Sequence, residues 1–155
     1  MPLVNRVRPR VGDVVEIQTK KGLAYAQFTH SHRRYGALLR VFGEFFARRP
    51  NDFTKLVTQP LLFEAFFPLG SACAQNIVAI VANEPIARPR DFPMFRTGIE
   101  NPMGVVDCWW LWDGETEQRI GKLKQGMEHY PIRGVINDTL LIERIEDGWR
   151  AERVT

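Results

Sequence analysis

Three segments with strand-like alternation follow one another between residues 13 and 42 and constrain the fold most. In the first, apolar Val15 and Ile17 alternate with polar neighbours. Alternation with a period of two sends successive side chains to opposite faces of a sheet. Short polar turns separate the segments, which are DVVEIQT (13–19), LAYAQFTH (23–30) and YGALLRVF (35–42). This arrangement predicts an antiparallel meander, which could form part of a small SH3-like barrel.

The rest of the chain contains further short strands and little helix. Apolar runs predict strands at LLFEAFF (61–67), at IVAIVANEPI (77–86), which we expect to be buried on both faces, and at VVDCWWLW (105–112). Asp113-Gly114 predicts a type I′ hairpin that returns through residues 115–123. Short helices are expected at 52–58 and 71–76, and residues 87–104 form the longest irregular connection. The predicted fold class is therefore α+β, with mostly antiparallel strands.

Residues 138–147 have two interpretations. Asn137 offers a helix N-cap, Leu141 and Ile145 are four residues apart, and Gly148 suits the position after a helix. The alternative is a β-hairpin that turns at Asp147-Gly148.

The chain length of 155 residues favours one domain, with residues 1–11 as a mobile basic lead-in. The N-terminus lacks the apolar core of a secretory signal, and no stretch is long and apolar enough to span a membrane. Two widely spaced cysteines, Cys73 and Cys108, do not form a disulfide framework, and both are expected to be buried. We expect a cytoplasmic protein with no membrane partner.

Candidate catalytic and metal-binding residues are few. His30 and His32 share one side of a strand, but a metal site needs further ligands, so a polar turn is expected there. Nothing around Cys73 would activate it as a nucleophile. Glu64 is expected to face solvent or to pair with an arginine on the neighbouring strand. The common nucleotide-binding and hydrolase motifs are absent. We expect no enzyme activity, no cofactor and no metal.

Two features suggest a binding surface. The run WWLW (109–112) is apolar on both faces, so either the protein itself or a partner must cover it. In the second case, Trp109 or Trp112 would be exposed and would anchor the complex. The N-terminal third is basic, and Arg33, Arg34 and Arg40 lie near aromatic residues of the meander. Such a surface could bind an acidic protein or a single-stranded nucleic acid.

The order and spacing of several segments resemble the immunity protein 26 family of bacterial polymorphic toxin systems. The segments are GDVVEIQTKKGLAYAQFTHSH, YGALLRVF, FFPLG, WWLWDG and NDTLLIERI, which together span roughly residues 11–148. The resemblance implies an α+β fold and a non-enzymatic protein that neutralises a cognate toxin by binding it. Immunity proteins against basic nucleases are typically acidic, whereas this chain has a net charge of +3. Either its toxin is not a basic nuclease, or its acidic residues cluster locally.

Overall fold

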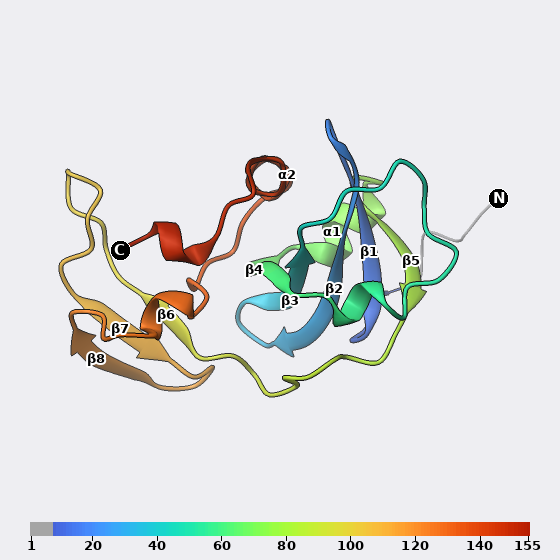
Figure 1. Ribbon diagram of the computed structural model, residues 1–155. Helices are drawn as coiled ribbons and strands as arrows, with labels where there is room; N and C mark the ends of the chain where they lie inside the picture. Colours follow the sequence, from blue (N-terminus) through green and yellow to red (C-terminus); the bar gives the residue numbers. More distant parts are fainter. Residues whose placement is uncertain (1–7) are drawn as a thin grey trace.

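The structure is a computed structural model that describes residues 8–155. It is an α+β fold with two antiparallel sheets and few helices, which confirms the predicted fold class. The predicted mobile lead-in lies mostly in residues 1–7, outside the described residues. The elements, labelled as in Figure 1, are β1 (Asp13–Thr19), β2 (Gly22–His32), β3 (Gly36–Phe42), η2 (Leu56–Thr58), β4 (Leu61–Phe67), α1 (Leu69–Ala74), β5 (Ala79–Asn83), β6 (Phe95–Thr97), β7 (Trp109–Trp112), β8 (Glu117–Gly121), η3 (Met127–His129), α2 (Asp138–Asp147) and η4 (Ala151–Arg153).

The larger sheet is the predicted meander with one strand added. Its strand order is β4-β3-β2-β1-β5, and every neighbouring pair is antiparallel. β4 and β5 are the edge strands and do not pair with each other, so the sheet does not close into a barrel. β5 was expected to be buried on both faces, which is wrong: its residues are half-buried or exposed, because it pairs only with β1 at the sheet edge.

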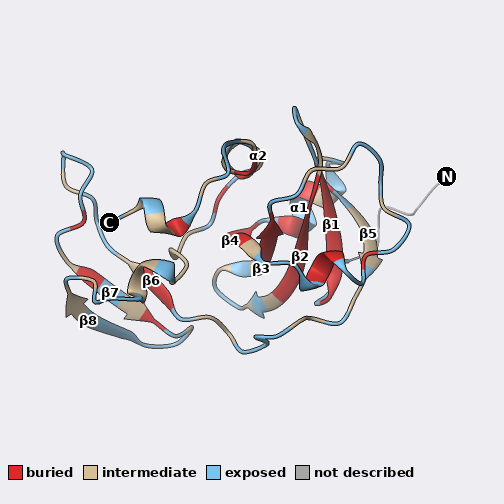
Figure 2. Ribbon diagram, viewed as in Figure 1, coloured by how far each residue is buried: buried red, intermediate tan, exposed pale blue. Residues whose placement is uncertain are grey.

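The main core lies on one face of the larger sheet. Ala24 and Ala26 of β2 are fully buried there, beside large side chains of β4 and α2. Helix α2 buries Leu141 and Ile145 against this face, and the strands beneath it are buried as Figure 2 shows. The side chain of Asn137 accepts a hydrogen bond from the backbone N–H of Leu140. The helical interpretation of residues 138–147 is thus confirmed, and the alternative hairpin is wrong.

The smaller sheet has the order β6-β7-β8 and contains the aromatic run. The predicted type I′ turn between β7 and β8 is wrong. Trp112 pairs with Glu117, so the loop has four residues, and only Gly114 in it has a positive φ, of 106°. The Asp113 carboxylate instead accepts the backbone N–H groups of Glu115 and Thr116. These bonds lower the pKa of Asp113, that from Thr116 most strongly.

An aromatic cluster joins the two sheets. Leu38 and Phe66 of the larger sheet form one buried group with Phe95 and Trp112 of the smaller sheet. Phe66 and Phe95 stack with their ring centroids 5.4 Å apart, and Trp112 lies 5.4 Å from Phe95. Both sheets thus share one core cluster. The organisation as one domain, expected from the length, stays a prediction.

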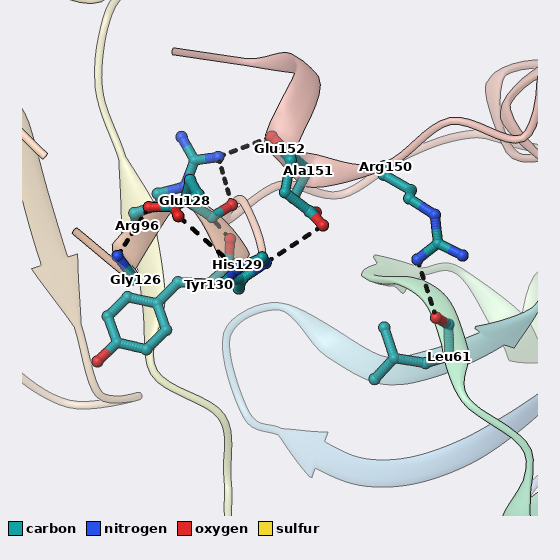
Figure 3. A network of polar contacts seen from close by, with 9 residues as sticks. All are labelled: Leu61, Arg96, Gly126, Glu128, His129, Tyr130, Arg150, Ala151 and Glu152. Carbon is teal, nitrogen blue, oxygen red and sulfur yellow. Dashed lines mark hydrogen bonds and ion pairs between the residues drawn. The ribbon is translucent and has the colours of Figure 1, made fainter. Parts of the chain in front are cut away.

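Arg96 of β6 organises the C-terminal part of the chain (Figure 3). Its side chain is fully buried and, among residues 8–155, contacts no carboxylate at hydrogen-bonding distance. The guanidinium group donates instead to four backbone carbonyl oxygens, those of Tyr130, Val154, Glu128 and Ala151. It also lies 4.4 Å from the ring centroid of Trp109. Burial lowers the pKa of Arg96, while Glu152 and Glu128 oppose this effect.

Within residues 8–155, no helix is long and apolar enough to cross a membrane.

Candidate binding cleft

A cleft of about 1230 Å³ lies where the turn between β2 and β3 meets the loop between β7 and β8. Figure 1 shows this turn, in light blue, pointing toward the smaller sheet. Three of the five residues that the sequence suggested for partner binding line this cleft: Arg33, Arg34 and Trp112. The full lining is Ser31, His32, Arg33, Arg34, Tyr35, Trp112, Gly114, Glu115, Glu117 and Arg133.

His32 fixes the shape of the turn that carries the two arginines. Its Nε2 lies 2.7 Å from the carbonyl oxygen of Gly114, which can only accept, so Nε2 carries the proton. Its Nδ1 then accepts the backbone N–H groups of Arg34 at 3.1 Å and Tyr35 at 3.2 Å. Both ring nitrogens are therefore engaged by backbone groups. His32 positions the turn against the loop at Gly114 and has no free nitrogen to act as a catalytic base.

The floor of the cleft is aromatic and carries one ion pair. The rings of Tyr35 and Trp112 meet edge to face with centroids 5.2 Å apart. The guanidinium carbon of Arg133 lies 5.2 Å from the Trp112 ring centroid and 5.8 Å from that of Tyr35. Arg133 also donates to the Glu117 carboxylate at 2.6 Å. This pair occupies Glu117, so the charge of that carboxylate is already balanced within the cleft.

Arg33 and Arg34 are both exposed, and neither takes part in an ion pair among residues 8–155. Glu115 is the carboxylate lining the cleft that Arg133 does not engage. The cleft therefore offers two guanidinium groups to an incoming ligand, above an aromatic floor. Guanidinium groups bind carboxylates and phosphates through paired hydrogen bonds.

Comparisons with protein-family models, curated proteins and solved structures found no match. The resemblance to the immunity protein 26 family therefore stays a prediction based on the sequence pattern.

Arg40 does not belong to this surface, and its expected role in an exposed basic patch is wrong. It is only 5% exposed, because the segment after β5 covers this face of the larger sheet. Its guanidinium donates to the carbonyl oxygens of Ala87 at 3.0 Å and Pro89 at 2.8 Å. Arg40 therefore holds the chain as it leaves the larger sheet, and it is unavailable to a partner.

Glu64 is Arg40's cross-strand neighbour and is likewise buried, so the expectation that it faces solvent is wrong. Burial raises the pKa of Glu64 to about 7, although the charge of Arg40 opposes this shift. Glu64 does lie opposite an arginine on the neighbouring strand, as expected. The two side chains form no hydrogen bond, since Arg40 donates to the carbonyl oxygens of residues 87 and 89.

The tryptophans of β7 follow the expected alternation. Trp109 and Trp112 are 2% and 4% exposed, so the protein itself covers them, and the alternative in which one of them is exposed to anchor a partner is wrong. Arg96 pairs with Leu111 and contacts Trp109, whereas Phe95 pairs with Trp112 and packs against it, so Trp109 and Trp112 lie on opposite faces of β7 and β6 covers both. Trp110 is the exposed tryptophan of the run, at 37%. Trp112 reaches the cleft as part of its floor, whereas Trp109 lies under Arg96.

Sequence reasoning missed Arg133 and Glu117. Both lie in polar stretches without a motif, and their place depends on the four-residue loop that sets Trp112 opposite Glu117. Both histidines lie at the end of β2 rather than in the expected polar turn, and each contacts a distant backbone carbonyl: His30 contacts that of Arg90 at 2.8 Å. Within the described part of the chain, no group of three acidic, histidine or cysteine side chains could hold a metal. Both cysteines are half-buried rather than buried.

Proposed function

We propose that this protein is an immunity-like protein of the bacterial cytoplasm, which binds and neutralises a cognate toxin domain without catalysis. The observation that carries the proposal is the cleft, where two guanidinium groups that form no ion pair within the described residues lie above an aromatic floor. Arginine and aromatic side chains dominate the energetics of protein interfaces. The resemblance in sequence pattern to immunity protein 26 supplies the class of partner.

The charges of the cleft favour a protein partner over a nucleic acid. Glu115, whose charge Arg133 does not balance, lines the same cleft as Arg33 and Arg34. A phosphate backbone, which is negative along its whole length, would be repelled by this carboxylate. A protein can instead place a carboxylate opposite each arginine and keep its own negative charges away from Glu115. We therefore expect the toxin to present an acidic rather than a basic surface here.

The proposal is tested by growth rescue. The product of the gene next to the one that encodes this chain is expressed in a bacterial host, with and without this protein. Rescue by the wild type is expected, and it should be lost in the double variant Arg33→Gln/Arg34→Gln. The control Arg48→Gln/Lys55→Gln removes two exposed charges elsewhere and should still rescue. Failure of the wild type to rescue, or full rescue by the cleft variant, would contradict the proposal.

A further inference from the structure

A second, smaller pocket adjoins the cleft. It has a volume of about 350 Å³ and is lined by Thr97, Gly98, Ile99, Asp107, Cys108, Trp110, Glu117 and Arg133. Glu117 and Arg133 line both spaces, so their ion pair forms the boundary between them. Cleft and pocket thus make one continuous surface along one face of β7.

The two ends of this surface differ in chemistry. The cleft end carries Arg33 and Arg34, whereas the pocket end carries exposed apolar side chains. Ile99 is 90% exposed and Trp110 is 37% exposed. Asp107 also lines the pocket and would repel a second carboxylate there. An acidic group is therefore favoured at the cleft end and disfavoured at the pocket end.

The strand geometry sets the distance between the two ends. Trp110 and Trp112 pair regularly with β8 and point to the same face, two residues apart. Two residues of an extended strand span about 6.8 Å. A ligand in extended conformation with the same repeat would place side chains two residues apart over Trp112 and Trp110.

Resting on the proposed function, we infer that the partner binds here through one extended segment, with a carboxylate two residues from a large apolar side chain. The carboxylate pairs with Arg33 and Arg34, and the apolar side chain enters the pocket beside Trp110 and Ile99. The arginines supply charge recognition, and the pocket fixes the position and direction of the segment.

The test is an NMR titration of the full chain with three blocked pentapeptides. The first contains two glutamates, a glycine, a leucine and a phenylalanine, in that order. The second replaces the two apolar residues by serines, and the third replaces the two glutamates by lysines. We expect the first peptide to bind at least about tenfold more tightly than the serine peptide, because burial of one large apolar side chain contributes at least that factor. It should exceed the lysine peptide by a similar factor, because the cleft arginines repel the lysines. It should shift the signals of Arg34 and of the Trp110 indole together.

Two variants make the result specific. Trp110→Ala should reduce the affinity for the first peptide to that for the serine peptide, while Met103→Ala should leave it unchanged. Met103 is 87% exposed in the same connection but does not line the pocket. Equal binding of the first two peptides, or signal shifts away from Trp110, would overturn this inference. The growth-rescue experiment can still succeed in that case, so the two proposals fail separately.

Discussion

Replacement of Arg96 should destabilise the protein more than replacement of any exposed arginine. We consider Arg96→Met, which keeps the apolar stem over Trp109 but removes all the hydrogen-bond donors. Four carbonyl oxygens, 2.7–3.3 Å from the guanidinium nitrogens in the wild type, then lose this donor, although that of Ala151 still accepts the backbone N–H of Val154. The guanidinium is the shared contact of the chain segments around Tyr130 and Ala151.

The size of the effect follows from the burial of these carbonyls. The bond to Ala151 is buried, while the other three are partly buried, so water can replace part of what is lost. An unsatisfied buried polar group costs about 1–3 kcal/mol, and the lost cation–π contact adds about 1 kcal/mol. The desolvation of the guanidinium, which the variant avoids, offsets part of this cost. We expect a net loss of about 2–3 kcal/mol in the free energy of unfolding.

Urea denaturation followed by circular dichroism measures this loss, and thermal melting should show a decrease of roughly 4–12 °C. Hydrogen exchange should accelerate first at residues 127–130 and 151–154. Arg96→Lys should fall between Met and the wild type, because one ammonium group cannot reach four separated carbonyls. Arg48→Met is the matched control at an exposed position and should change stability by less than about 0.5 kcal/mol. A loss below about 1 kcal/mol for Arg96→Met would refute the role assigned to this residue.

Three further predictions concern folding. Trp112→Ala should cost about 3–5 kcal/mol of unfolding free energy in denaturation experiments, whereas Trp110→Ala should cost under about 1 kcal/mol; equal losses would contradict the burial pattern. The pKa of Glu64 is raised by burial to about 7, so its contribution to stability is complete below about pH 4.5 and is lost as pH rises through 7. Glu64→Gln should therefore gain stability relative to the wild type between pH 5 and 8, by up to about 3 kcal/mol. Parallel profiles of unfolding free energy against pH for the two proteins would rule this out. Gly114→Val should lower the melting temperature, because its φ is 106° and a Cβ would lie 2.9 Å from the Phe92 ring; an unchanged melting temperature would show that the loop adapts.

Local sequence patterns predicted those elements whose signals are local. The alternation at Val15 and Ile17 gave β1 correctly, and the Asn137 cap with apolar residues four apart predicted α2. Alternation correctly separated Trp109 from Trp112 at WWLW, but it could not show that both are covered, because the cover comes from Arg96 and Phe95 of β6. The strand β5 resembled a buried central strand, but its position at the edge depends on the order of the whole sheet.

The candidate site was only partly predictable for a related reason. Arg33 and Arg34 stand out as adjacent charges in a turn, and the turn keeps them exposed. Arg40 is an equally ordinary charge in the sequence, and only the packing of residues 87–89 shows that it is buried. Arg96 has no local signal at all, since its partners lie more than 30 positions away along the chain.

The affinity of the toxin complex tests the central claim most directly. The dissociation constant between this protein and the product of the neighbouring gene can be measured by calorimetry for the wild type and for Arg33→Gln/Arg34→Gln. A single-stranded oligonucleotide titrated into the same samples serves as the competing ligand. Our account predicts at least about 100-fold weaker toxin binding by the variant, as expected for the loss of two arginine–carboxylate contacts, with an unchanged melting temperature and no tight oligonucleotide binding. Wild-type toxin affinity in the variant, or oligonucleotide binding that the variant abolishes, would contradict it.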